Sequence, residues 1–72
     1  MIKCHLSTLM GAHKLKIADV SRETGLNRST VTALYNESAK RVDIDAVDQL
    51  CKLFNCNVGD LLEYVDEERK SN

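Results

Sequence analysis

The sequence predicts a compact all-α domain of five helices. Apolar residues recur at intervals of three and four residues along most of the chain, which is the spacing of amphipathic helices. There is no proline and there are only three glycines, so no linker or low-complexity tract divides the 72 residues. We therefore expect one domain at residues 1–65, followed by a charged, disordered tail at 66–72.

The first helix is expected at about residues 5–13, where one helical face is formed by Leu6, Leu9, Met10 and His13. Gly11 weakens this helix by about 1 kcal/mol relative to alanine. We interpret His13 as a boundary residue at the helix C-terminus rather than as a ligand or catalyst. The weak alternation of residues 1–4 leaves a short strand open as their conformation.

Two short helices joined by a tight turn are expected at about residues 16–24 and 28–36. Gly25 stands where the first of them must end, because glycine adopts the left-handed conformation without a Cβ penalty. Asn27 is the predicted N-cap of the second, its side chain accepting from free backbone N–H groups. Val31 and Leu34 face inward, which leaves on the outer face Arg28, Ser29, Thr32, Ala33 and Asn36.

Residues 37–42 lack periodicity and are expected to form a loop. A helix follows at about 44–54, with Asp43 as its N-cap and an apolar stripe formed by Ile44, Val47, Leu50, Cys51 and Phe54. Asn55 can end it in the left-handed conformation. Asn57 then caps a last short helix, with Asp60 reaching back in a capping box. Tyr64 and Val65 are expected to be extended.

The helix pair at 16–36 resembles the helix-turn-helix of the phage repressor and Cro family, a group of small xenobiotic-response-type bacterial regulators. The residues that carry the resemblance are Val20, Ser21, Gly25, Leu26, Val31 and Leu34. The similarity extends from about residue 2 to 65, since AVDQLCKLFNCNVGDLL matches the family's last two helices. It implies a lambda-repressor-like DNA-binding domain. The chain departs from the family at Lys16-Ile17, where a polar residue is common, and at Tyr35, where glutamate is common.

The resemblance also implies which residues meet DNA. The start of the helix at 28–36 would enter the major groove, with base-side positions at Asn27, Arg28, Ser29, Thr32 and Ala33. Arg28 is the best candidate for a base contact, because its planar fork fits guanine O6 and N7. Phosphate contacts would fall to Lys16, Asn36, Lys40 and Arg41. As alternatives, Asn27 is only a cap, Asn36 only ends its helix, and Lys40 and Arg41 are ordinary solvated charges.

The charge distribution favours a nucleic-acid partner more than the net charge of −1 does. Residues 1–42 hold seven basic and three acidic side chains, whereas residues 43–72 hold three basic and eight acidic ones. The half with the helix pair therefore carries +4 and the other half −5. Such a chain can present one positive face to DNA. Charges scattered over solvated faces are the alternative.

No enzymatic chemistry is indicated by the sequence. We find no catalytic triad order, no glycine-rich phosphate loop and no metal-ligand spacing, and we expect neither a cofactor nor a metal. The three cysteines, an odd number, suggest reduced thiols, and we interpret Cys51 and Cys56 as buried small hydrophobic residues. We expect no signal peptide and no transmembrane helix, and therefore a cytoplasmic protein without membrane contact.

We predict a sequence-specific regulator of double-stranded DNA, a repressor, that acts as a homodimer. Its interface is expected at Leu61, Leu62, Tyr64 and Val65, which offer more apolar surface than one short helix easily buries. Ile2 and Cys4 would contribute if residues 1–4 form a strand beside 63–65. The alternative is that these residues only close the core of the monomer. A rival function is an antitoxin-like or adaptor module that uses the same fold to hold a protein partner.

Overall fold

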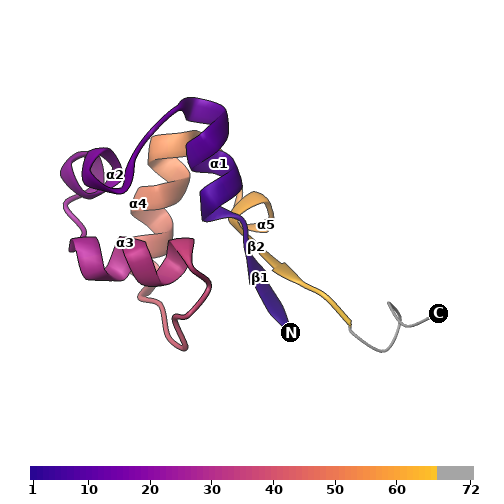
Figure 1. Ribbon diagram of the computed structural model, residues 1–72. Helices are drawn as coiled ribbons and strands as arrows, with labels where there is room; N and C mark the ends of the chain where they lie inside the picture. The colour runs from indigo at the N-terminus through magenta and orange to yellow at the C-terminus, as the bar shows by residue number, and fades with distance from the viewer. Residues whose placement is uncertain (67–72) are drawn as a thin grey trace.

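The computed structural model describes residues 1–66 and consists of five helices and two short strands (Figure 1). In chain order these are β1 (Ile2–Cys4), α1 (Leu6–His13), α2 (Ile17–Thr24), α3 (Arg28–Tyr35), α4 (Ile44–Phe54), α5 (Val58–Leu61) and β2 (Leu62–Tyr64). The predicted five-helix fold is confirmed, and every predicted helix boundary lies within two residues of the observed one. The disordered tail expected at 66–72 lies, except for its first residue, outside the described residues.

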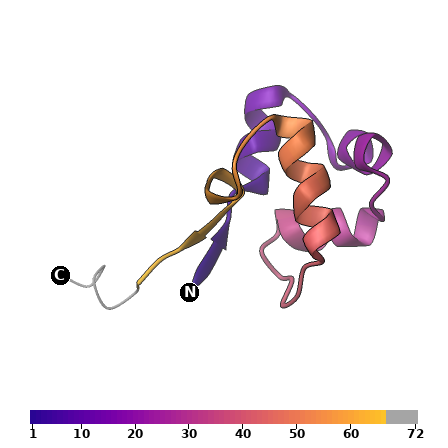
Figure 2. The ribbon, with the colours of Figure 1, turned by 180° about the vertical axis from the view of Figure 1, so that it is seen from behind.

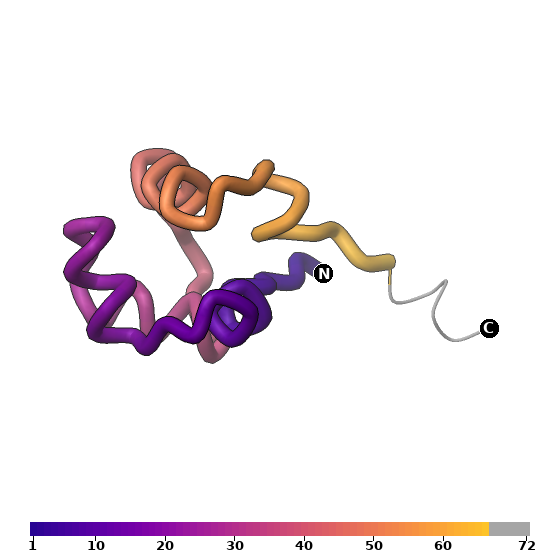
Figure 3. The backbone as a smooth tube through the Cα atoms, turned by 90° about the horizontal axis from the view of Figure 1, so that it is seen from above, coloured from indigo at the N-terminus to yellow at the C-terminus, as the bar shows by residue number. Residues whose placement is uncertain are grey.

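A single core holds the helices together, and each helix contributes one fully buried side chain to it. These are Leu6, Val20, Val31, Leu50 and Leu61, in the order α1 to α5. Viewed from above, α4 faces α1 and α2 across this core (Figure 3). Burial of an aliphatic side chain stabilises a fold by about 1.5–3 kcal/mol. Because all five helices share one core, the packing that stabilises the domain also fixes α3 against α2.

The two ends of the described chain pair with each other. Strands β1 and β2 form an antiparallel ribbon in which Ile2 faces Tyr64 and Cys4 faces Leu62. The pairing extends by one residue, since the Val65 N–H donates to the Met1 carbonyl at 2.8 Å. This ribbon projects from the helical body (Figures 1 and 2), and the Cα trace measures 41 × 23 × 18 Å. The strand left open for residues 1–4 is thus present.

The buried stripe of α4 differs from the predicted one at two positions. Its core-facing residues are Ala46, Val47, Leu50 and Phe54. At 100° per residue, Ile44 lies about 100° from the mean direction of those four side chains and Cys51 about 85°. Ile44 is accordingly 82% exposed, and Cys51 is half-buried. The predicted placement of Ile44 in the core and the full burial of Cys51 were therefore wrong; Cys56 is also only half-buried.

The ends of α4 and α5 are set by local signals, most of which were predicted. Asn55 is left-handed with φ of 51°, and the Asn57 N–H donates to Asp60 Oδ2 at 3.0 Å. Asp43 occupies the N-cap position of α4 with an extended backbone, but its side chain makes no capping hydrogen bond within residues 1–66. The position of the N-cap was therefore predicted correctly, but the predicted capping hydrogen bond of the Asp43 side chain is wrong. None of the helices in the described part of the chain has the length and hydropathy that a membrane span requires.

Candidate nucleic-acid interface

The turn between α2 and α3 is held by hydrogen bonds that set the angle of the helix pair. Gly25 is left-handed with φ of 76°, and its N–H donates to the Ser21 carbonyl at 2.9 Å. The Ser21 hydroxyl donates to the Leu26 carbonyl at 2.6 Å. The Thr24 hydroxyl donates to Val20 and accepts from the Leu26 N–H at 3.2 Å. In the sequence, Ser21 served only as one of the residues that carry the family resemblance. The hydrogen bonds of the Ser21 and Thr24 hydroxyls were not predicted, although serine and threonine commonly bond to nearby backbone.

Helix α3 buries one face and leaves the other in solvent. Val31 is 0% and Leu34 5% exposed, which confirms that both face inward. Arg28 and Ser29 are exposed, whereas Thr32 and Ala33 are half-buried beside the exposed side. The sequence-predicted base-side residues of α3 are therefore together on one surface. Their contacts with DNA remain a prediction.

Asn27 precedes α3 in the N-cap position, with an extended ψ of 146°. Its side chain makes no capping hydrogen bond within residues 1–66, so the predicted capping bond is wrong. The amide is exposed and remains available to an outside partner. Asn36 at the other end has an ordinary right-handed backbone, and the left-handed residue is the next one, Glu37, with φ of 57°.

Glu37 is a structural residue that sequence reasoning missed. Its Oε1 accepts from the Cys4 N–H at 3.0 Å, which ties the loop after α3 to strand β1. The Ser38 N–H and the Ala39 N–H both donate to the Ala33 carbonyl, at 2.9 and 3.3 Å, and so fold the loop back on α3. A left-handed glutamate has no strong sequence signal, and its partner lies 33 residues away.

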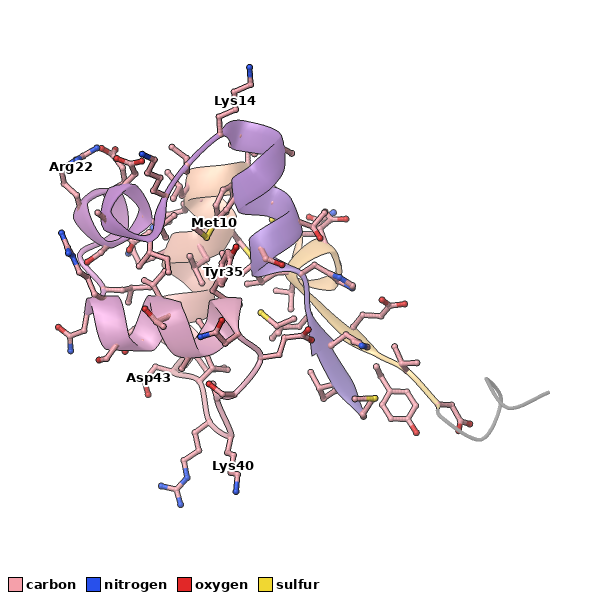
Figure 4. All side chains as sticks on the ribbon, in the orientation of Figure 1. Met10, Lys14, Arg22, Tyr35, Lys40 and Asp43 are labelled. Carbon is pink, nitrogen blue, oxygen red and sulfur yellow. The ribbon has the colours of Figure 1, made fainter. Side chains whose placement is uncertain are left out.

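The cations that were predicted to meet DNA are exposed and have no ion pair within residues 1–66; they are Lys16, Arg28, Lys40 and Arg41. Lys40 extends from the α3–α4 loop away from the helical body (Figure 4). Arg22 differs, because it pairs with Asp19 at 3.1 Å and with Glu23 at 3.5 Å. These cations without an ion pair in the described part of the chain lie on α3, on the loop after it and at the start of α2.

Lys16 is positioned by the start of α2. Its backbone N–H donates to Asp19 Oδ2 at 2.9 Å, which is half of a capping box, since a lysine side chain cannot accept the reciprocal bond. The pKa of Asp19 lies below its ordinary value, first because of this N–H bond and then because of Arg22. The carboxylate therefore stays charged at neutral pH, and the Lys16 ammonium remains in solvent at the N-terminus of α2.

The four residues predicted for a dimer interface differ in exposure. Leu61 is 2% exposed and belongs to the core, so it was wrongly included. It is buried because α5 is only four residues long and uses this side chain to close the core. Tyr64 is 70% exposed, and Leu62 and Val65 are half-buried.

His13, which was predicted to be a helix-boundary residue, is the last residue of α1. Its ring packs edge-on against the ring of Phe54, with 5.1 Å between the two ring centroids.

The thiols and other metal-binding side chains do not form a ligand set in the described part of the chain, where no three of His, Cys, Asp and Glu gather around one point. Burial raises the pKa of the Cys4 thiol. Burial, followed by the neighbouring Cys51, raises the pKa of Cys56.

Tyr35, at the end of α3, lies toward α1 (Figure 4) and is 41% exposed.

Comparison with known proteins gives two findings. The model of a protein family described as Cro/C1-type HTH DNA-binding domain matches residues 5–67 of the chain. The chain is also similar to YozG of Bacillus subtilis (strain 168), which is described as an uncharacterized HTH-type transcriptional regulator. The two are 25% identical over 64 residues, which cover 89% of this chain and 76% of the relative.

Proposed function

The chain belongs to the Cro/C1-type helix-turn-helix DNA-binding family, and we propose that it represses transcription by inserting α3 into the major groove of its operator. The observation that carries this proposal is the exposed side of α3, where Arg28 begins the helix without an ion pair within residues 1–66. A major groove admits an α-helix and displays a distinct donor and acceptor pattern for each base pair. Repression follows when the bound domain covers a promoter.

The residues on this surface take different parts in the proposed complex. Arg28 donates two hydrogen bonds to guanine O6 and N7, and Asn27, Ser29 and Thr32 are weaker readers of base edges. Ala33 presents its methyl group to a thymine. Phosphates are bound by residues that ring this surface, namely Lys16, Asn36, Lys40 and Arg41. The exposure of these cations and of both asparagines supports the assignment.

Two copies are needed for useful specificity, because one α3 helix reads only a few base pairs. We propose that the protein binds as a homodimer through its C-terminal strand, with Leu62, Tyr64 and Val65 at the interface. Tyr64 supports this most strongly, since a side chain of that size is 70% exposed. Tethering makes the second half-site contact effectively intramolecular.

Selection of bound duplexes from a random pool, followed by titration at low and moderate salt, tests the proposal. We expect an enriched palindromic sequence, specific affinity above that for random DNA, and weaker binding as salt rises, because phosphate contacts release counterions. A protein-interaction adaptor would show no salt-sensitive affinity for any duplex. That result would overturn the proposed function.

A further inference from the structure

Two cysteines meet where α4 ends. Asn55 is left-handed with φ of 51°, and its N–H donates to the Lys52 carbonyl at 3.3 Å. The next N–H, that of Cys56, donates to the Cys51 carbonyl at 3.0 Å. These two bonds define a Schellman motif, in which the chain after the left-handed residue folds back over the last turn of the helix. A side-chain contact between the two positions that Cys51 and Cys56 occupy commonly accompanies this motif.

The two thiol groups interact with each other. Cys51 and Cys56 are free, half-buried and packed against the core. Burial raises the pKa of Cys56, and the Cys51 thiol raises it further through its charge and a hydrogen bond. A hydrogen bond between two side chains acts only over a short distance, so the two sulfur atoms are neighbours. The helix cap and the interaction of the thiols therefore both place these side chains together.

The backbone of this cap suits a disulfide. In disulfides the two Cα atoms usually lie about 4.4–6.8 Å apart. One backbone hydrogen bond holds the Cα atoms of its two residues about 5–6.5 Å apart. Cys51 and Cys56 can therefore be joined by rotation of their side chains, without displacement of α4. A metal site is less well supported, because within residues 1–66 no three of His, Cys, Asp and Glu gather around one point.

We infer that Cys51 and Cys56 are a modification site at which a peroxide produces a reversible intrachain disulfide. The disulfide fastens the last turn of α4 to the connection before α5, and α5 closes the core with Leu61. Both cysteines lie at the C-terminal end of α4, whereas α3 and the loop after it precede the other end of that helix. Oxidation should therefore stabilise the fold without altering the exposed side of α3. The inference does not depend on the proposed function.

The reaction balances with hydrogen peroxide as the oxidant. One thiolate of the pair attacks a peroxide oxygen, so that an S–O bond forms, the O–O bond breaks and hydroxide leaves. The thiolate of the other cysteine then attacks the oxidised sulfur, so that the S–S bond forms, the S–O bond breaks and a second hydroxide leaves. The two thiol protons convert both hydroxides to water. Because the thiolate is the attacking form, the reaction should be slow at pH 7 and faster at pH 9.

Peroxide treatment of the 72-residue protein, followed by mass spectrometry without reductant, tests this inference. We expect the intact protein to lose the mass of two hydrogen atoms and to regain it on addition of dithiothreitol. Trypsin cleaves after Lys52, between the two cysteines, so the disulfide should join the peptides 42–52 and 53–69. Cys4 should still react with iodoacetamide in the unfolded oxidised protein.

Two cysteine variants and a melting experiment complete the test. Cys4→Ser is the matched control and should form the linked peptides at the wild-type rate, whereas Cys51→Ser should form none. Thermal unfolding followed by circular dichroism then reports on the fit of the disulfide to the cap. The oxidised wild type should melt several degrees higher than the same sample after dithiothreitol, because a disulfide that fits the native geometry constrains the unfolded chain.

Three outcomes overturn the inference. Cys51 and Cys56 that stay reduced at pH 9, or that gain oxygen atoms singly without a link, show that the two thiols do not act as a pair. A disulfide that includes Cys4, or that joins two chains, shows that another pairing is preferred. An oxidised protein that melts below the reduced one shows that the cap holds the two sulfur atoms apart. None of these measurements uses DNA, so the result is separate from the test of the proposed function.

Discussion

Arg28 is the residue whose replacement tests DNA reading most directly. Its guanidinium begins α3 in solvent and offers a rigid fork of donors that matches guanine. We expect Arg28→Ala to weaken binding to the selected duplex by about 1–3 kcal/mol and to relax preference at one base pair. The free energy of unfolding should change little, because the side chain has no ion pair within residues 1–66. Titration of duplexes substituted one base pair at a time measures the effect.

Arg22 provides the control for this experiment. It is exposed like Arg28, but it lies on α2 and pairs with Asp19 and Glu23. Arg22→Ala should leave the base preference unchanged. If Arg28→Ala lowers the affinity for selected and random duplexes equally, Arg28 contacts a phosphate instead of a base.

The thiols provide a second residue-scale prediction. Burial raises the pKa of both Cys4 and Cys56 above the ordinary value of 9.0. A higher pKa means a smaller thiolate fraction at any given pH, and the thiolate is the reactive form. In the native protein, alkylation of both cysteines should therefore be slow at pH 7 and should still accelerate above pH 9. Mass spectrometry with and without urea measures this, and equal rates in folded and unfolded protein would contradict it.

At the scale of elements, Gly25 sets the end of α2. Its φ of 76° is left-handed, and a Cβ added there would meet no atom within 4 Å. The cost of Gly25→Ala is therefore backbone strain alone, and we expect the free energy of unfolding to fall by about 1–2 kcal/mol. Urea unfolding followed by circular dichroism measures it.

Gly11 provides the opposite case with the same substitution. It lies within α1, and an added Cβ would also find nothing within 4 Å. Alanine is the better helix former, so Gly11→Ala should raise the free energy of unfolding by about 0.5–1 kcal/mol. If Gly25→Ala and Gly11→Ala changed the free energy of unfolding in the same direction, the difference in backbone conformation between the two glycines would not control their effect on stability.

At the scale of the whole molecule, the proposed dimer places two α3 helices on one side of the DNA. Half-sites about 10 base pairs apart then present their major grooves to both helices at once. We expect such a duplex to bind much more tightly than a single half-site. Insertion of five base pairs turns the second half-site to the opposite face and should lower the affinity to that of one half-site.

The insertion experiment has its own control, because ten added base pairs restore the facing of the two half-sites. A rigid dimer should not regain tight binding to that duplex, since its reach is set by the interface. Recovery with ten base pairs would indicate a dimer joined flexibly enough to span the longer distance, and equal binding to all three duplexes would indicate two independently binding protomers. Gel-shift titration at constant salt distinguishes these results, since affinity depends strongly on ionic strength.

Much of the fold was predictable because its signals are local. The inward stripe of Val31 and Leu34 determined which side of α3 is exposed, and Gly25 and Asn55 marked two helix ends, because left-handed residues are needed there. The same locality placed the candidate DNA surface. Exposure on one helix follows from periodicity alone, without knowledge of the neighbours.

What only the tertiary structure decided involves partners distant in sequence. The ribbon joins residues 2–4 to 62–64, and the Glu37 carboxylate reaches the Cys4 N–H across 33 residues. Leu61 looked available for a partner, yet it closes the core, whereas Ile44 looked buried and is exposed. Periodicity identifies the face of a helix but not how far the neighbouring elements extend over it. The groove lined by Leu34, Val42 and Tyr64 likewise exists only because the terminal ribbon and the α3–α4 loop lie next to each other in space.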